Sequence, residues 1–398
     1  MSYHFVCRRA LGFRNEPHAL HSSCQISIRY EDFFMLRSFR LCQTIALTGL
    51  LTLWGTSASA CTGITIRPAD GSVVFARTME FGIDLRSNVI IVPRGHSFEG
   101  TAPGGKPGMQ WTSKFGIVGT NAFDEPLIAD GLNEKGLHVG LFYFPGFAKY
   151  QEVKSTDAER TLAPWELCSY LLGMCGSVDE AVEAANHVLV GEVVMEKMGF
   201  VPPLHLVATD SSGESMVFEY VDGKLNVHAN PLGVVTNSPP FDWHMTNLRN
   251  YINLTPQNSG GLDLAGNKIE ALGQGSGMLG LPGDFTPPSR FVRAVAYTQS
   301  ALPVETAEQG VLQAFHLLNQ FDIPKGAATS TENGKEVADY TLWTNVVDLK
   351  NLRHYFRTYE NSQIRMVDLQ QLDFDAKTIS TVSMRGDEVI EDLSKTAK

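Results

Sequence analysis

Cys61 is the residue of this chain best placed to do chemistry, because of the segment that precedes it. Residues 35–60 have a basic start with Arg37 and Arg40, an apolar middle over 41–54 and a small-x-small ending at 58–60. This is the pattern of a secretory signal peptide. Cleavage after Ala60 would make Cys61 the first residue of the mature chain, so that a thiol and a free α-amine lie on one residue.

Such a residue combines a nucleophile with its own base. A free cysteine thiol has a pKa near ~8.5, which a nearby guanidinium lowers, and an α-amine titrates near ~7.7–8.0. The amine can therefore take the thiol proton close to neutral pH, and no histidine partner is required. The histidines of 61–398 form no HExxH motif, and His205 and His244 are expected to be surface or core residues.

Two neighbouring motifs resemble the start of a known family. Residues 61–63 read Cys-Thr-Gly, and residues 76–81 read Ala-Arg-Thr-Met-Glu-Phe. This sequence is similar to the choloylglycine hydrolase and penicillin V acylase family, amidases with an N-terminal cysteine nucleophile. The resemblance extends through separated motifs over nearly all of 61–398. It implies an enzyme that hydrolyses linear amide bonds.

The resemblance also assigns roles on the second strand. Arg77 matches the arginine that stabilises the thiolate. Glu80 matches a position that is commonly Asp and binds the amine of the cysteine, so that Glu keeps the carboxylate but adds a methylene. Phe81 is expected to line the pocket for the acyl group of the substrate.

Three further positions carry the remaining chemistry of the family. Asn237, in Thr-Asn-Ser-Pro at 236–239, matches the side chain that donates to the oxyanion. Tyr143 matches the position whose backbone amide completes the oxyanion hole and whose side chain faces the substrate. Arg290 matches a second guanidinium near the nucleophile. Asp130-Gly131 and residues 133–136 also match the family well, but we interpret them first as turn chemistry.

Composition excludes some classes of partner. Residues 1–60 hold six of the 32 basic and three of the 43 acidic side chains, which leaves 26 basic against 40 acidic groups in 61–398. This acidic balance argues against nucleic acid. No other apolar run is long enough to span a bilayer, so we expect no membrane contact after signal cleavage. Neither a cofactor nor a metal is expected.

Cys168 and Cys175 are expected to be buried thiols, too far apart along a helix for a disulfide.

The elements that must position these residues alternate between runs of strands and pairs of helices. Strands are predicted at 61–66, 72–79, 88–92, 127–130, 137–144, 204–209, 215–220, 224–228, 234–236, 340–348, 353–359 and 363–369. Helices are predicted at 164–175, at 178–188 from a capping box at 177–180, and at 290–302 and 304–319. Residues 260–283 hold eight glycines and are predicted to form a long surface loop.

This order predicts an α+β fold with antiparallel sheets. The resemblance implies the four-layer αββα sandwich of N-terminal-nucleophile hydrolases. Residues 1–34 precede the methionine of the signal and are interpreted as a non-native upstream extension, 35–60 as the signal peptide, and 61–398 as a single domain.

Several functions fit these observations. Tyr143 favours a penicillin V acylase-like enzyme, since bile salt hydrolases of the family tend to carry Asn there. Conjugated bile salts and N-acyl homoserine lactones are alternative substrates for the same chemistry. A lipid-anchored binding protein with an acylated Cys61, or an inactive protein that keeps residues 1–60, would be of another class. The expected location is periplasmic or secreted, and the family implies a homotetramer.

Overall fold

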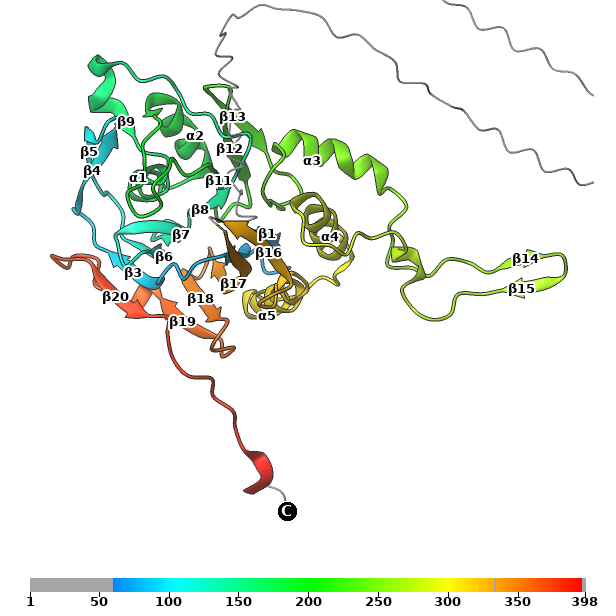
Figure 1. Ribbon diagram of the computed structural model, residues 1–398. Helices are drawn as coiled ribbons and strands as arrows, with labels where there is room; N and C mark the ends of the chain where they lie inside the picture. The colour runs from blue at the N-terminus through cyan, green and yellow to red at the C-terminus, as the bar shows by residue number, and fades with distance from the viewer. Residues whose placement is uncertain (1–59, 333, 396–398) are drawn as a thin grey trace, which may run out of the picture. The chain divides into compact units, whose positions relative to one another are not determined.

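The computed structural model describes residues 60–332 and 334–395 (Figure 1). The predicted upstream extension and the predicted signal peptide, except for Ala60, lie outside the described residues. Among the described helices, none is long and apolar enough to cross a bilayer.

The first sheet has six strands and carries Cys61 at one end. Its order is β1–β2–β17–β18–β19, and β16 pairs with β17; all pairs are antiparallel. The strands are β1 (Cys61–Ile66), β2 (Val74–Phe81), β16 (Ala328–Glu332), β17 (Lys335–Asp348), β18 (Arg353–Thr358) and β19 (Arg365–Asp368). Every residue of β1 and β2 is buried, because these strands are covered on both faces.

The second sheet has eight antiparallel strands in the order β13–β12–β11–β8–β7–β6–β3–β20. They are β3 (Asn88–Val92), β6 (Ile117–Ala122), β7 (Leu127–Asn133), β8 (His138–Tyr143), β11 (Leu204–Thr209), β12 (Ser215–Val221), β13 (Lys224–Ala229) and β20 (Ser380–Ser383). Short pairs form beside it from β4 (Ser97–Ala102) with β5 (Lys106–Thr112), and from β9 (Thr161–Leu162) with β10 (Leu189–Val190).

Helices cover the outer face of each sheet. Helices α4 (Pro287–Ser300) and α5 (Ala307–Leu318) pack on the six-stranded sheet, and α1 (Glu166–Met174) and α2 (Val178–His187) pack on the eight-stranded sheet (Figure 1). One apolar cluster joins the facing sides of the two sheets and extends to α4 and α5, and a second lies beneath α1 and α2. These layers confirm the predicted α+β class and the αββα sandwich.

The predicted capping box begins α2. The Ser177 hydroxyl accepts a hydrogen bond from the backbone N–H of Glu180 (3.2 Å), and the Glu180 carboxylate accepts one from Gly176 N–H (2.7 Å). The box is thus shifted by one residue on its second bond: it satisfies the N–H of Glu180, which a helix start leaves open, and the N–H of Gly176 just before the cap.

Several predicted segments differ from the structure. Residues 260–283 contain a hairpin, β14 (Leu262–Leu264) and β15 (Asn267–Ile269), rather than a loop alone. Residues 234–236 form only an isolated bridge, between Val235 and Gly63. Strand β7 continues to Asn133, beyond the predicted end at residue 130. A helix not predicted, α3 (Phe241–Asn247), follows the Asn237 segment.

Candidate active site

Cys61 begins β1 and is 1% exposed. In the β1–β2 register it lies opposite Met79, and its thiol donates to the Met79 thioether sulfur at 3.8 Å. The backbone nitrogen of Cys61 donates to Asn237 Oδ1 at 2.9 Å. The thiol and the nitrogen that would become the α-amine after cleavage are therefore both held in fixed contacts.

Gly63 explains why the Asn237 segment reaches Cys61. Gly63 and Val235 exchange two backbone hydrogen bonds, of 2.8 and 3.0 Å. A Cβ atom on Gly63 would lie 2.7 Å from the Val235 side chain, so a larger residue would push the two backbones apart. This bridge sets the register that brings Asn237, two residues further on, beside Cys61.

The side chain of Asn237 is held at both ends. Its Oδ1 accepts from Cys61 N and from Arg290 Nη2, the latter at 2.6 Å. Its Nδ2 donates to the Tyr143 carbonyl oxygen at 2.7 Å. An amide nitrogen has two hydrogens, so this orientation leaves Asn237 with the right kind of group to donate to a substrate oxygen as well.

Two buried histidines fix the backbone around Asn237. His205 Nε2 lies 3.1 Å from Thr236 O, and His244 Nε2 lies 2.9 Å from Asn237 O. Because a carbonyl can only accept, both ring nitrogens donate. The Glu219 carboxylate orients the ring of His205, since Glu219 Oε1 lies 3.2 Å from His205 Nδ1. Burial lowers the pKa of His244 to about 4. Both residues belong to the core, and sequence analysis gave neither of them a role.

Arg290 connects three parts of the site from the helical side. It lies in the first turn of α4, and its Nη1 donates to the Cys61 carbonyl and to Thr62 Oγ1 (3.0 Å). Its Nε donates to Phe285 O at 2.8 Å. Burial lowers the pKa of Arg290 to about 10, so it stays charged at neutral pH.

Arg77 approaches from the opposite face of the β1–β2 pair, between the two sheets. It is fully buried, and its Nη1 donates to Leu141 O at 2.5 Å. The guanidinium lies 4.0 Å from the centre of the Phe142 ring. Its Nη2 contacts Met79 Sδ at 3.9 Å, the same sulfur that the Cys61 thiol contacts. Arg77 and the thiol thus share one neighbour.

Glu80 is buried on β2 and accepts a hydrogen bond from Thr341 Oγ1 (3.0 Å). Its backbone N–H donates to Ala60 O at 2.9 Å. Burial raises the pKa of Glu80 to about 8, and the nearby charge of Arg290 opposes this only in part. The residue before Cys61 is therefore bonded directly to the strand that carries the predicted amine-binding carboxyl.

A narrow apolar cavity of about 70 Å³ opens beside Cys61. Phe81 and Tyr143, the two predicted substrate-binding residues, both line it and meet edge to face at 5.9 Å between ring centroids. Three methionines also line it: Met79, Met195 and Met198. Because methionine side chains are flexible and polarizable, this lining can adapt to a bulky acyl group.

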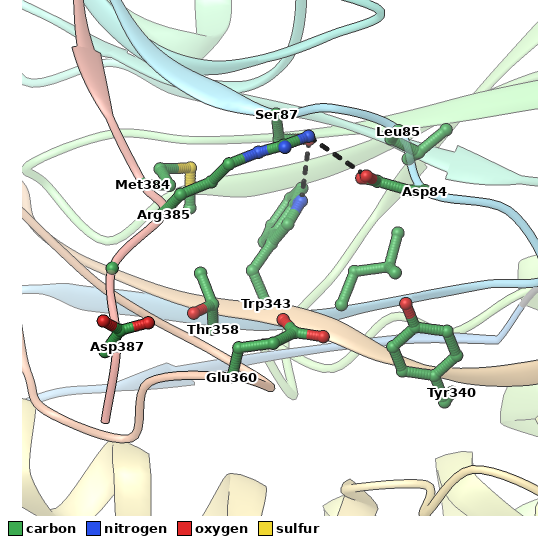
Figure 2. Close-up of a pocket in the computed structure, with 12 residues that line it drawn as sticks. Asp84, Leu85, Ser87, Tyr340, Trp343, Thr358, Glu360, Met384, Arg385 and Asp387 are labelled. Atoms are coloured by element: carbon green, nitrogen blue, oxygen red, sulfur yellow. Dashed lines mark hydrogen bonds and ion pairs between the residues drawn. The ribbon is translucent and has the colours of Figure 1, made fainter.

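A larger cavity of about 390 Å³ lies nearby but has a different lining (Figure 2). Figure 2 shows Arg385 reaching toward Asp84, with which it forms an ion pair of 3.1 Å, and the Trp343 indole donating to Ser87 Oγ at 3.2 Å. Leu85 lines both cavities. Cys61 lines only the smaller one of the two, which makes the smaller cavity the candidate pocket for an acyl group.

The other described thiols are unsuited to catalysis. Cys168 and Cys175 are free and buried, as expected. Burial raises the pKa of Cys175 to about 12, and it also raises the pKa of Cys168 well above its ordinary value.

The described residues contain no cluster of three or more His, Cys, Asp or Glu side chains that could hold a metal.

The interpretation of Asp130 as a turn residue is wrong. Asp130 lies inside β7 and is 1% exposed, and its carboxylate lies 3.8 Å from Arg77 Nη1. The Asp-Gly pair misled the interpretation because it is common in turns.

Comparison with known proteins agrees with this geometry. Residues 61–382 match the family described as linear amide C-N hydrolases, choloylglycine hydrolase family. The chain is 32% identical to a bile salt hydrolase/transferase of Clostridium perfringens, over 81% of this chain and 96% of that protein. It is 31% identical to a penicillin V acylase of Pectobacterium atrosepticum, over 81% of this chain and 85% of that protein.

Solved structures give the same result. A variant of conjugated bile acid hydrolase from Clostridium perfringens has a TM-score of 0.73 at 30% identity, covering 84% of this chain and 100% of that one. Penicillin V acylase from Agrobacterium tumefaciens has a TM-score of 0.65 at 25% identity, covering 81% and 91%. The chain therefore belongs to the choloylglycine hydrolase family and is a hydrolase of linear amide C–N bonds.

Proposed function

We propose that this protein is a secreted amidase that attacks its substrate with the Cys61 thiol, after cleavage of the chain behind Ala60. The observation that carries the proposal is the 2.9 Å contact between Cys61 N and Asn237 Oδ1, at the edge of an apolar cavity that Cys61 lines. The family match, which begins at residue 61, also supports Cys61 as the first residue of the mature chain.

The contacts of Cys61 and Asn237 support the following catalytic steps. The freed α-amine of Cys61 takes the thiol proton, directly or through a water, and the thiolate attacks the amide carbon. The second hydrogen of Asn237 Nδ2 and the backbone amide of Tyr143 stabilise the oxyanion, a contribution that in comparable sites is worth ~2.7–4 kcal/mol for one donor. The protonated amine then donates to the leaving nitrogen, and water hydrolyses the thioester.

Each charged neighbour has a part in this sequence. Arg77 and Arg290 lie on opposite faces of the β1–β2 pair and offset the negative charge of the thiolate and the oxyanion. Glu80 binds the α-amine in this proposal, and the hydrogen bond from its backbone N–H to the carbonyl oxygen of Ala60 supports this role. Cleavage removes Ala60 and introduces a positive charge, which favours the ionised form of Glu80.

For the substrate, we propose an amide with an aromatic acyl group, as in penicillin V. The support is Tyr143, whose ring lines the acyl cavity and packs against Phe81. Conjugated bile salts are the second candidate, because the chain is 32% identical to a bile salt hydrolase/transferase over most of its length. N-acyl homoserine lactones are a third candidate for a periplasmic enzyme.

The experiment compares kcat/KM for penicillin V, a glycine-conjugated bile salt and an N-acyl homoserine lactone. The proposal expects the highest value for penicillin V and loss of all three activities in Cys61→Ala. Cys61→Ser is the matched variant, and it should keep at most a trace of activity because an alcohol is a weaker nucleophile. Full activity of Cys61→Ala would contradict the proposed nucleophile, and a preference for the bile salt would contradict only the substrate.

The intact mass of the mature protein tests secretion and lipid anchoring together. The proposal expects the mass of residues 61–398 with an unmodified cysteine, recovered from the periplasm or the medium. A diacylglycerol adduct on Cys61 would instead identify an anchored protein without a free nucleophile.

We also propose that the protein assembles with further copies of itself, as a tetramer. Support comes from the β14–β15 hairpin, whose Leu262, Leu264 and Ile269 are 61%, 54% and 50% exposed. A two-stranded hairpin alone is marginally stable in water, so a second copy covering it would stabilise it. Light scattering on the wild type and on Leu264→Asp should give a tetramer and a smaller species, respectively; a monomeric wild type would refute the assembly.

A further inference from the structure

A buried polar network lies beneath Arg77, between the two sheets. Asp130 on β7 faces Arg77 on β2, with 3.8 Å between Asp130 Oδ1 and Arg77 Nη1. His138 Nε2 donates to Asp130 Oδ1 at 2.9 Å, and Asn345 Nδ2 donates to Asp130 Oδ2 at 2.9 Å. All four side chains are at most 1% exposed. The network connects a residue of the proposed site to groups that have no contact with the acyl cavity.

Asp130 provides the negative charge that a buried guanidinium requires. Within the described residues, the hydrogen bonds and ring contacts of Arg77 are with neutral groups, namely backbone carbonyls, the Phe142 and Trp343 rings and the Met79 sulfur. An isolated charge in an apolar interior is unfavourable unless it is paired. Burial alone would raise the pKa of Asp130, but His138, Arg77 and Asn345 outweigh it and hold the pKa at about 2. The carboxylate is therefore ionised.

The position of the carboxylate is fixed from several sides. His138 and Asn345 each hold one of its oxygens, and Asn345 also donates to Thr120 Oγ1 at 2.8 Å. Gly140 lies opposite Asp130 in the β7–β8 register. A Cβ atom on Gly140 would lie 2.8 Å from Asp130 Oδ1 and 3.4 Å from Arg77 Nη1. The pair thus fills a space that allows no side chain at residue 140.

We propose that Asp130 is a positioning residue for catalysis, which holds the Arg77 guanidinium at the Met79 sulfur, beside the Cys61 thiol. The proposal rests on the proposed function, because it requires Cys61 to be the nucleophile. His138 and Asn345 orient Asp130, and Gly140 leaves room for the ion pair. Asp130 does not touch the substrate, so its effect on the reaction passes through Arg77.

A double-mutant cycle tests whether the effect passes through Arg77. Asp130→Asn keeps the shape of the side chain and removes its charge. We expect it to lower kcat about 100-fold, since a misplaced catalytic group can cost that much, and to change KM less than about threefold because Asp130 lies outside the acyl cavity. In an Arg77→Met background the same substitution should lower kcat by less than about threefold.

Two outcomes would overturn the proposal. One is an Asp130→Asn enzyme with nearly wild-type kcat, and the other is a loss of similar size in both backgrounds, which is the result of a merely structural role. Gly140→Ala provides a second perturbation if Asp130→Asn does not fold. It forces the ion pair to shift, so its loss of kcat should also disappear in the Arg77→Met background, and an undiminished loss there would overturn the proposal as well.

Asp348→Asn is the matched control, because Asp348 is also 1% exposed. Its carboxylate accepts from Asn351 Nδ2 (2.7 Å) and from the backbone N–H groups of Lys350 and Asn351. It should keep kcat within about threefold of the wild type. Cys61→Ala separates the two levels of the argument. If that variant is active, the proposed function fails; if it is inactive while the cycle is additive, only the role of Asp130 fails.

Discussion

Replacing His244 with glutamine tests how the protein holds Asn237 in place. His244 is 2% exposed, stacks on Phe291 with 4.7 Å between ring centroids, and donates from Nε2 to Asn237 O at 2.9 Å. A glutamine amide can reach a similar point and can donate, but it does not titrate. His244→Gln therefore keeps the hydrogen bond and removes the proton equilibrium.

The size of the effect follows from the pKa. Burial lowers the pKa of His244 from 6.5 to about 4. Below pH 6.5 the unfolded chain binds a proton that the folded chain does not bind until about pH 4. The stability that the neutral His244 provides is thus fully present above pH 6.5 and is lost as the pH falls to 4. At about 1.4 kcal/mol per pKa unit, this loss is about 3 kcal/mol.

Urea unfolding of both proteins at several values between pH 7 and pH 4 measures this loss. The wild type should lose about 3 kcal/mol more free energy of unfolding than His244→Gln over this range. Parallel curves for the two proteins would refute the reasoning. His354→Gln is a comparator for stability alone, since burial lowers the pKa of His354 to about 4 as well.

Activity at pH 7 separates the hydrogen bond from the titration. His244→Gln should keep kcat within about threefold, because its amide still donates to Asn237 O. His244→Leu leaves that carbonyl without its donor, at a cost of about 1–3 kcal/mol, and it should lower kcat as Asn237 loses its fixed position. Equal activity in the two variants would mean that His244 does not position Asn237.

Three further predictions concern single side chains. Asn237→Ala should lower kcat about 10²–10³-fold with a small change in KM, as for other single oxyanion donors; steady-state kinetics will show whether KM changes instead. In the unprocessed chain, Glu80→Gln should raise the free energy of unfolding at pH 7 by about 3 kcal/mol relative to the wild type. The reason is that burial raises the pKa of the Glu80 carboxyl to about 8, so that Glu80 stabilises the fold only while it is protonated. This stability is lost as the pH rises from about 4.5 to 8. Urea unfolding at pH 4.5 and pH 7 should give a difference only at the higher pH. Cys175 and Cys168 should resist iodoacetamide at pH 8 in the folded protein, and peptide mass spectrometry showing rapid labelling of either would contradict their burial.

Local sequence patterns predicted the individual elements well. Strands β3 and β11 begin and end at the predicted residues, and the Ser177 cap marks the start of α2. Strand ends and helix caps depend on residues that are neighbours in the sequence, so the order of residue types predicts them. The β14–β15 hairpin was missed because glycines dominate its surroundings and hide the two short runs of three residues each.

The candidate site depended on family motifs instead. Cys61 and Asn237 are 176 positions apart, and the Gly63–Val235 bridge brings them together. No periodicity of either segment encodes that contact. Asp130 shows the opposite case, in which a local pattern typical of turns concealed a long-range ion pair. His205 and His244 were missed for the same reason, since each acts on a backbone carbonyl that no side-chain motif reveals.

The central claim is that Cys61 is both the first residue of the active protein and its acyl carrier. Mass spectrometry of active enzyme, quenched with acid during turnover of penicillin V and then digested, tests both parts at once. The N-terminal peptide should begin at Cys61 and carry the acyl group on that residue. Active enzyme that begins at another residue, or an acyl group found elsewhere, would contradict the account.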